Sequence, residues 1–255
     1  MVQVTPVPAF SDNYIWLLSK GGKACVVDPG DADPVLAALE ARNLELTDIL
    51  ITHHHFDHVG GLASLVSRYG PTIYGPENPA IDAITHRVRA DDTVEVLDTA
   101  FRILEVPGHT LDHIAYLHEG PSPLLFCGDT LFAGGCGRVF EGTFEMMFNS
   151  LHQLALLPPD TRVFCAHEYT LANLAFAEAV EPQNSALQSR IADARALREQ
   201  NIPTVPSDIG TELATNPFLR CEESVLLDSL REQGRLEGQT GPEVFATVRG
   251  WKDNF

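Results

Sequence analysis

The sequence predicts an α/β body followed by a helical appendage, and three observations favour this fold class. Up to about residue 169, short runs rich in branched and aromatic residues alternate with segments of helical apolar spacing. After that point only helix-like segments follow. Several strand-like runs also end in a small or turn residue and then a His or Asp, and open α/β proteins build their sites at such strand ends.

The body is expected to contain eight strands and three helices. The predicted strands read YIWLLSK (14–20), ACVVDPG (24–30), DILIT (48–52), TVEVLD (93–98), FRILEVPG (101–108), IAYLHE (114–119), PLLFCGD (123–129) and RVFCAHE (162–168). Apolar residues at helical spacing predict helices over 33–43, 61–70 and 144–157.

The remainder of the chain reads as helices separated by turns marked by Pro and Gly, such as IPTVPSDIG and GQTGP. Helices are expected over 171–180, 184–201, 223–233 and 242–255. The sequence therefore predicts an α/β body over residues 1–169 and a helical appendage over residues 170–255.

Composition limits the possible partners. The chain has 255 residues, of which 44% are hydrophobic, and a formal net charge of −18. Such a charge repels nucleic acid and anionic membranes, so neither is expected to bind. No apolar run approaches the roughly 18 residues that cross a bilayer, and MVQVTPVPAF lacks the features of a signal peptide. We expect a cytoplasmic monomer, whose five scattered cysteines are reduced thiols.

The segment THHHFDH, residues 52–58, places four histidines and one aspartate within seven residues. In an extended chain, residues two apart point the same way, so His53, His55 and Asp57 could converge. His58 follows beside two glycines, where the chain can turn sharply. Extended ligands followed by a turn can present two clusters of donors to two neighbouring metal ions.

Three further candidate ligands come directly after strand-like runs: His109, Asp129 and His167. Five histidines and two aspartates suit a divalent ion such as zinc, iron or manganese. Seven ligands are too many for one ion but fit two ions that share a bridging aspartate. A solvated histidine-rich loop would leave the repeated strand-end placement unexplained, and structural zinc sites are usually rich in cysteine.

These segments resemble the hydroxyacylglutathione hydrolase (glyoxalase II) family of the metallo-β-lactamase superfamily. THHHFDH matches the T-H-x-H-x-D-H motif of the whole superfamily, whereas GCGRVFEGT, HEYT and the R-x-x-K-D ending are more specific to the glutathione thioesterases. The similarity runs from DNYIWLL near the start to the terminal VRGWKDNF. The resemblance implies an αββα sandwich with a C-terminal helical domain.

The resemblance also implies a reaction and a ligand set. The reaction is hydrolysis of S-lactoylglutathione to lactate and glutathione, the second step of methylglyoxal detoxification. Two divalent ions are implied, most simply Zn²⁺, with iron or manganese as alternatives. One ion would take His53, His55 and His109, the other Asp57, His58 and His167, with Asp129 bridging them. The glutathione-binding positions fall on Arg138, Tyr169, Arg249 and Lys252.

The implied chemistry uses a water shared by the two ions, whose pKa falls toward about 7. The resulting hydroxide, held at the ions that Asp129 and Asp57 bind, would attack the thioester carbonyl. The leaving thiolate has a conjugate acid of pKa about 8.5, so no dedicated general acid is expected. A second hypothesis, acyl transfer to a nucleophilic Cys136, also accounts for thioester cleavage. A chelator and a thiol-alkylating agent would distinguish the two.

Other residues have simpler interpretations. His54 is expected to point away from the ligands, and His86, His118 and His152 are expected on the surface. Asp28 is expected to fix a strand-end turn or to hydrogen-bond a metal ligand. Two positions depart from the family pattern. Phe140 replaces a tyrosine of some relatives, and Asp112 replaces a glycine and would be strained if that position required a positive φ.

Other functions on the same fold would differ from thioester hydrolysis in metal content, export or surface charge. A persulfide dioxygenase uses a similar ligand frame with one iron, a β-lactamase is normally exported, and a nuclease needs a basic face. A non-catalytic metal-binding protein would not need a bridging aspartate.

Overall fold

The computed structural model describes residues 2–255, which form two compact units. The first unit contains the chain up to Glu105 together with Asp112–Gly128, and the second contains Val106–Leu111 and Asp129–Phe255. The combination of sheets with C-terminal helices confirms the predicted α/β class. The described part of the chain has no helix long and apolar enough to cross a membrane.

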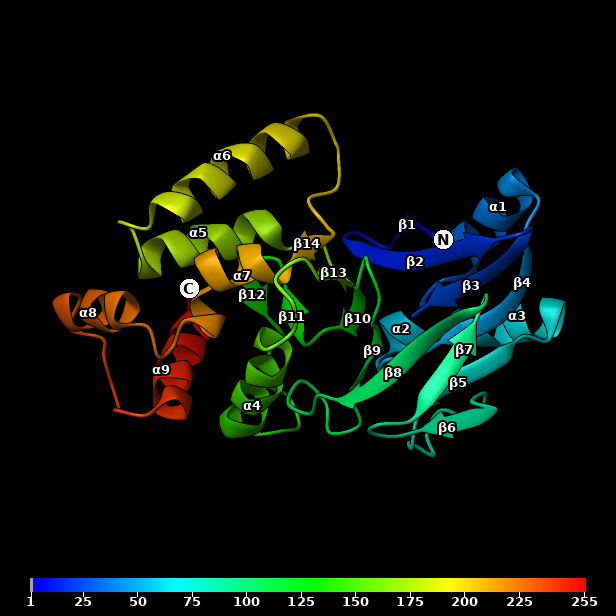
Figure 1. Cartoon of the computed structure of the whole chain (residues 1–255), viewed down its shortest axis with the longest axis horizontal. Helices are drawn as coiled ribbons and strands as arrows, with labels where there is room; N and C mark the ends of the chain where they lie inside the picture. Colours follow the sequence, from blue (N-terminus) through cyan, green and yellow to red (C-terminus); the bar gives the residue numbers. More distant parts are fainter. Residues whose placement is uncertain (1) are drawn as a thin grey trace. The chain divides into compact units, whose positions relative to one another are not determined.

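A six-stranded sheet forms most of the first unit (Figure 1). Its strands follow the chain in order: β1 (Gln3–Ala9), β2 (Asn13–Lys20), β3 (Lys23–Val27), β4 (Glu45–Leu50), β5 (Thr72–Pro76) and β6 (His86–Val88). The first three are antiparallel, and β3 to β6 are parallel. The parallel connections carry α1 (Ala32–Arg42), α2 (Phe56–Val59) and α3 (Leu62–Tyr69). Apolar side chains of α1 and α3 pack with those of the sheet into one core.

Four antiparallel strands complete the first unit, in the order β10-β9-β8-β7. They are β7 (Thr93–Val96), β8 (Thr99–Glu105), β9 (Ile114–His118) and β10 (Leu124–Gly128). The buried hydroxyl of Tyr116 on β9 lies 2.8 Å from the carbonyl oxygen of Ile51 and 3.2 Å from that of Tyr74. It therefore links these strands to the carboxyl end of β4 and to the middle of β5. Burial raises the pKa of Tyr116 well above the ordinary value.

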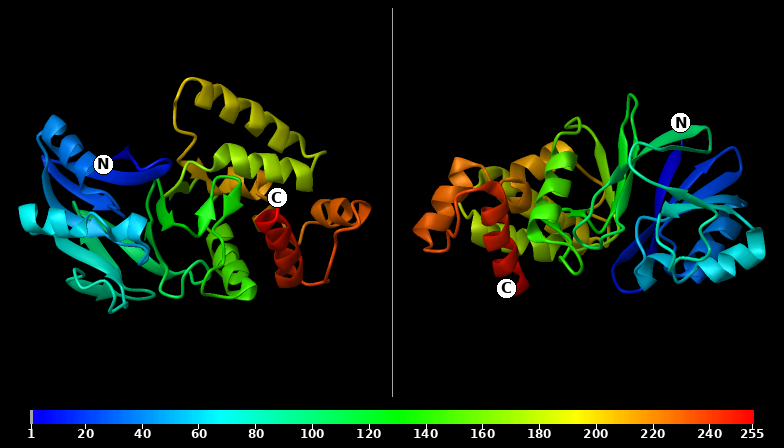
Figure 2. Two further views of the ribbon diagram at one scale, coloured as in Figure 1. Left: turned by 180° about the vertical axis from the view of Figure 1, so that it is seen from behind. Right: turned by 90° about the horizontal axis from the view of Figure 1, so that it is seen from below.

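The second unit is mainly helical. It contains the hairpin of β11 (Leu131–Phe132) and β12 (Gly135–Cys136), and the antiparallel pair of β13 (Arg162–Cys165) and β14 (Ser207–Asp208). Its helices are α4 (Phe144–Ala155), α5 (Thr170–Val180), α6 (Ser185–Glu199), α7 (Ile209–Thr215), α8 (Ser224–Glu232) and α9 (Gly241–Asp253), with a 3₁₀ turn over Pro217–Leu219. Figures 1 and 2 show α5 beside α6, and α4 beside α9.

Local sequence explains where the helices of the second unit begin. The Thr143 side chain accepts from the Met146 N–H at the start of α4, and the Asn184 side chain accepts from the Leu187 N–H at the start of α6. At α9, Thr240 and Glu243 form a capping box. These boundaries agree with the predicted helices to within a few residues.

Candidate metal centre

Asp28 organises the loop that carries the histidine cluster. It follows β3, adopts a left-handed φ of 53° and is only 4% exposed. Its carboxylate accepts from the Thr52 backbone N–H at 2.8 Å and from the Thr52 hydroxyl at 2.7 Å. The same carboxylate lies 3.0 Å from His58 Nδ1. Asp28 therefore fulfils both expectations: it fixes the strand-end loop and it hydrogen-bonds a candidate ligand.

These contacts determine how His53 presents its nitrogens. The Thr52 hydroxyl donates to Asp28, so it accepts from Nδ1–H of His53, 3.0 Å away. The lone pair of His53 is then on Nε2, which faces His55 Nδ1 at 3.2 Å. The His113 ring stacks on the His53 ring with centroids 4.5 Å apart and keeps its plane in place. A fixed tautomer of this kind is what a metal-ligating imidazole requires.

Asp57 and His58 form a second pair of donors in the first unit. Helix α2 begins at Phe56, so the extended backbone ends at His55 and does not reach Asp57 as we expected from the alternating pattern. With Nδ1 of His58 directed to Asp28, its Nε2 faces Asp57 Oδ2 at 3.5 Å. The Asn13 side-chain amide donates to the same Asp57 oxygen at 2.9 Å.

The second unit contributes His109, Asp129 and His167, each just after a strand. His109 Nδ1 donates to the Arg138 carbonyl at 2.8 Å, which leaves the lone pair on Nε2. That nitrogen lies 3.5 Å from Asp129 Oδ2, and His167 Nε2 lies 3.3 Å from Asp129 Oδ1. The two oxygens of one carboxylate thus face two different histidines.

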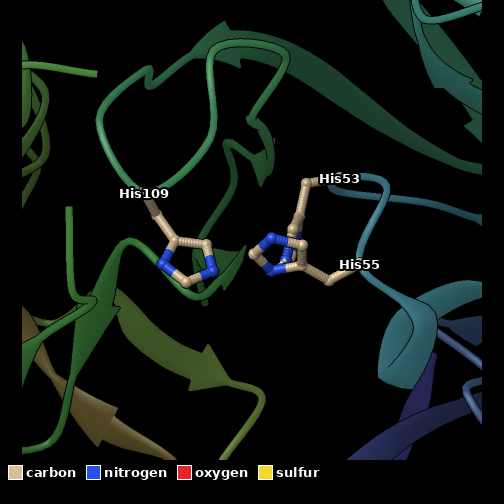
Figure 3. A group of neighbouring side chains, drawn as sticks. All are labelled: His53, His55 and His109. Atoms are coloured by element: carbon tan, nitrogen blue, oxygen red, sulfur yellow. Dashed lines mark hydrogen bonds between the residues drawn. The ribbon is translucent and has the colours of Figure 1, made fainter. Parts of the chain in front are cut away.

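The candidate donors form three overlapping groups. Figure 3 shows His53, His55 and His109 as neighbouring side chains, and their nitrogens lie within 4.8 Å of one another. The same spacing holds in two further groups. One contains His53, His58 and Asp129, and the other contains Asp57, His58 and His167. Neutral imidazoles and carboxylates in these groups suit a borderline divalent ion such as zinc, iron or manganese.

Tyr169 lies directly against a candidate ligand. Its ring stacks on that of His167 with centroids 4.7 Å apart and an interplanar angle of 2°, and it is 38% exposed. Phe132 meets both rings edge-on, at 5.7 Å from His167 and 5.4 Å from Tyr169. Tyr169 therefore offers a partly exposed aromatic surface beside His167, a candidate metal ligand of the second unit.

Arg138, Arg249 and Lys252 are the three predicted substrate-binding cations. The Asp253 carboxylate accepts from Arg138 Nε at 3.3 Å and from Arg249 Nη2 at 3.0 Å. Arg138 is exposed, whereas Arg249 is 5% exposed and also donates to the Cys136 carbonyl at 3.2 Å. Lys252 donates to the Ala172 carbonyl at 3.3 Å, and burial, followed by the nearby Arg249 charge, lowers its pKa.

Cys136 does not have the properties of a nucleophile. The thiol is buried, and burial raises its pKa to about 11, although the Arg249 guanidinium opposes this shift. Thiolate is the reactive species, so the Cys136 thiol is unreactive near neutral pH. The cysteine hypothesis is therefore rejected on the environment of this residue. The other four cysteines are also free and buried, in agreement with the expectation of reduced thiols.

The positions that depart from the family pattern are compatible with the fold. Asp112 is not among the residues with positive φ in the described chain, so it carries no left-handed strain. Its carboxylate lies 2.9 Å from His54 Nδ1 and accepts from the Asn78 amide at 2.7 Å. His54 is thereby held by a carboxylate. Phe140 is largely exposed, and its ring lies 5.3 Å from that of His109.

Comparison with known proteins gives matches to two families that together cover most of the chain. The family described as "Metallo-beta-lactamase superfamily" matches residues 9–167, and the family described as "Hydroxyacylglutathione hydrolase C-terminus" matches residues 168–255. Hydroxyacylglutathione hydrolases of Chromohalobacter salexigens and of Pseudomonas aeruginosa are each 53% identical to the chain, over 100% of both sequences.

Solved structures share the fold at lower identity. ETHE1 from Myxococcus xanthus gives a TM-score of 0.65 at 24% identity and covers 99% of this chain and 98% of its own. The BLEG-1 B3 metallo-β-lactamase gives 0.64 at 21% identity, with 86% and 99% covered. TTHA1623, solved in a di-iron-bound form, gives 0.59 at 26% identity, with 84% and 100% covered.

Proposed function

Since the chain belongs to the hydroxyacylglutathione hydrolase family of the metallo-β-lactamase superfamily, it is a thioester hydrolase, and we propose that seven His and Asp side chains hold the two divalent ions of its reaction. The reaction is the hydrolysis of an S-(2-hydroxyacyl)glutathione such as S-lactoylglutathione to the 2-hydroxy acid and glutathione. It is the second step of methylglyoxal detoxification.

The proposed ligand sets are those of the sequence prediction. One ion is held by His53, His55 and His109, the other by Asp57, His58 and His167, and Asp129 bridges them. The observation that supports this assignment most strongly is the Asp129 carboxylate, whose two oxygens face His109 and His167 at 3.5 Å and 3.3 Å. His109 belongs to a different group of donors from His167, so the two oxygens face two separate candidate ion positions.

The chain's own groups prepare the ligands for this role. When bound, two divalent ions lower the pKa of a shared water and polarise the thioester carbonyl. Asp28 and Thr52 fix the tautomers of His58 and His53, and the Arg138 carbonyl fixes that of His109. These partners keep each lone pair on the nitrogen that faces another donor. Such outer hydrogen bonds typically change metal affinity by about 10–100-fold.

Substrate recognition is proposed for Arg138, Tyr169, Arg249 and Lys252. A glutathione thioester carries two carboxylates and one ammonium group, so its net charge is about −1 at neutral pH. The protein at −18 repels such a molecule unless cations are placed locally. Arg138 and Arg249 meet at one carboxylate, Asp253, and Lys252 is its sequence neighbour. This grouping supports a local positive surface for the glutathione carboxylates.

We also propose zinc as the metal, a monomer in the cytoplasm, and a division into a catalytic domain over 1–169 and a helical substrate-binding domain over 170–255. The donor set supports zinc, with iron or manganese as alternatives. The family matches, which meet between residues 167 and 168, support the division.

The decisive experiment is an assay on S-lactoylglutathione with metal analysis of the same sample. We expect two divalent ions per chain and release of free thiol, abolished by a chelator and restored by zinc, iron or manganese. Turnover by protein that contains one ion or none would contradict the proposal.

A further inference from the structure

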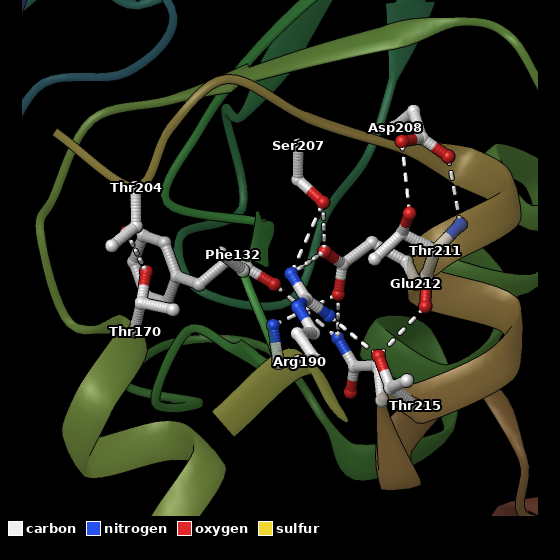
Figure 4. Close-up of polar contacts among 12 residues, drawn as sticks. Phe132, Thr170, Arg190, Thr204, Ser207, Asp208, Thr211, Glu212 and Thr215 are labelled. Carbon is white, nitrogen blue, oxygen red and sulfur yellow. Dashed lines mark hydrogen bonds and ion pairs between the residues drawn. The ribbon is translucent and has the colours of Figure 1, made fainter. Parts of the chain in front are cut away.

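A fully buried carboxylate lies in the second unit, outside the seven proposed metal ligands. Glu212 on α7 is 0% exposed, and a charge at such depth is costly unless hydrogen bonds and an opposite charge compensate it. Arg190 on α6 and Ser207 on β14 both donate to its Oε1. Figure 4 shows the guanidinium and the hydroxyl directed at this carboxylate. One side of Glu212 is therefore tied to the helical part of the chain.

The other oxygen of Glu212 holds the β11–β12 hairpin. Oε2 accepts from the Gly134 backbone N–H at 2.8 Å and from the Asn216 amide at 3.0 Å. The Asn216 amide also lies 2.9 Å from the Gly135 carbonyl and 3.3 Å from the Phe132 carbonyl. Glu212 and Asn216 thus satisfy backbone groups of both hairpin strands and of the turn between them.

The hairpin leads directly to the metal ligands of the second unit. Its first strand begins two residues after Asp129. Phe132, on that strand, meets the His167 ring edge-on, with centroids 5.7 Å apart. A displacement of the hairpin would therefore move the backbone that carries Asp129 and the ring that packs on His167.

We propose that Glu212 is a positioning residue of the metal centre. It does not contact the metals or the substrate. Its carboxylate connects α6 and α7 to the hairpin and so holds Asp129 and His167 at the spacing that the second ion needs. The inference rests on the proposed function, because Glu212 can position a metal centre only if Asp129 and His167 are metal ligands.

Glu181 provides a matched control for Glu212. It is 2% exposed and pairs with an arginine of the same helical region, Arg220, at 2.8 Å and 3.0 Å. Its burial, charge and type of partner resemble those of Glu212, but its ion pair joins the end of α5 to the segment after α7, not to the hairpin. A general loss of stability should affect both positions, whereas a loss of metal positioning should affect only Glu212.

The test compares Glu212→Gln with Glu181→Gln in the full-length protein. Metal-depleted samples are titrated with zinc in competition with a chromophoric chelator, and the visible spectrum of each cobalt-loaded sample is recorded. We expect Glu212→Gln to weaken one of two ions about tenfold, the lower end of the effect of groups that orient metal ligands. Its cobalt spectrum should change and its kcat should fall more than its KM rises. Glu181→Gln should lower Tm but keep both affinities and the spectrum.

Wild-type zinc affinities and cobalt spectrum in Glu212→Gln would overturn the inference. If Glu212→Gln does not fold, Phe132→Leu tests the contact between the hairpin and His167. This variant removes the ring that packs on His167 and leaves Glu212 intact. Weakened binding of one ion is expected there, and unchanged affinities and spectrum would again overturn the inference. Failure of the wild-type protein to bind two ions would instead count against the proposed function itself.

Discussion

Among individual residues, Asp129 has the largest predicted effect on the metal centre. Its two oxygens face His109 and His167, so a single carboxylate serves both proposed ion positions. Asp129→Asn keeps the size of the side chain but replaces one anionic oxygen by an amide donor. We expect loss or weakening of at least one ion and a fall in kcat by orders of magnitude. Metal analysis and the S-lactoylglutathione assay measure both effects.

Asp112→Asn is a suitable control for Asp129→Asn. Asp112 is partly buried, whereas Asp129 is buried, and Asp112 also lies beside a histidine, His54, at 2.9 Å. Neither Asp112 nor His54 is proposed as a ligand. This variant should retain two ions and at least a large part of the activity. The bridging assignment is wrong if Asp129→Asn binds two ions and turns over at the wild-type rate.

Cys136 allows a prediction from its raised pKa. With a pKa of about 11, the thiol is protonated at neutral pH and the thiolate forms only as the pH approaches that value. Iodoacetamide at pH 7.5 should therefore leave Cys136 unmodified and the activity unchanged, whereas a chelator should abolish activity. Mass spectrometry after the incubation identifies any modified cysteine. Rapid inactivation together with carboxamidomethylation of Cys136 would contradict both its burial and the metal mechanism.

At the level of elements, the sequence predicted those strands and helices that have a clear pattern of apolar residues. Branched runs between turn residues located β2, β3, β4, β7–β10 and β13, and helical spacing located α1, α3, α4, α5, α6, α8 and α9. It did not predict β1, β5, β6, β11, β12 and β14. In β1 (Gln3–Ala9), two prolines interrupt the run. Proline is tolerated there because β1 is an edge strand, where a missing N–H leaves no ladder partner unsatisfied. Short α7 begins at the end of a predicted turn and continues into a stretch to which no element was assigned, so sequence reasoning missed the buried Glu212.

The candidate ligands were predictable because they follow strands, whereas their supporting partners were not all predictable. His53, His109 and His167 each come within a few residues of a strand end. The Arg138 carbonyl that fixes His109 comes from a segment 29 residues away, and backbone acceptors of this kind have no sequence signature. Asp28 was the exception, since its place after a strand suggested a contact with a ligand.

Two glycines allow a test of this arrangement: Gly137, in the loop after β12, and Gly250, within α9. A Cβ at Gly137 would lie 2.0 Å from the Asp129 carbonyl oxygen and 3.1 Å from His109 Nδ1. Gly137→Ala should therefore displace the Asp129 backbone and the His109 ring, and reduce metal affinity and kcat together. At Gly250, within α9, nothing lies within 4 Å of the same added atom. Gly250→Ala should keep full activity and stabilise the helix by up to about 1 kcal/mol.

Zinc titration, kcat and thermal unfolding of the two glycine variants provide the measurements. Equal behaviour of the two variants would show that the close approach at Gly137 has no functional consequence.

On the scale of the whole molecule, composition predicted the effect of the net charge but not the local grouping of the cations. The excess of 35 acidic over 17 basic residues argued against nucleic acid and anionic membranes. It could not predict that Arg138 and Arg249 meet at Asp253, because Arg138 and Asp253 lie 115 residues apart in sequence. The three-residue spacing of Arg249 and Lys252 predicts that they share one face of a helix, but only the resemblance grouped them with Arg138.

This local grouping leads to a prediction about substrate identity. Arg249 is buried and already satisfied by Cys136 and Asp253, so its truncation would disturb packing as well as charge. Arg138 is exposed and Lys252 is half-buried, which makes Arg138→Met and Lys252→Met the cleaner tests. A charge-assisted hydrogen bond contributes about 1.5–3 kcal/mol. Each variant should therefore raise KM for S-lactoylglutathione by roughly ten- to a hundredfold.

The same variants should keep two metal ions and should hydrolyse a small thioester that lacks the peptide at the wild-type rate, because the chemistry depends on other residues. Arg235→Met is the control, since Arg235 lies 4.0 Å above the Trp251 ring, next to α9, but is not among the proposed substrate-binding residues. Its KM for S-lactoylglutathione should stay close to that of the wild type. If Arg138→Met and Lys252→Met change the two substrates equally, or change neither, these cations do not bind the glutathione moiety. The anionic substrate must then overcome the net charge of −18 through other residues.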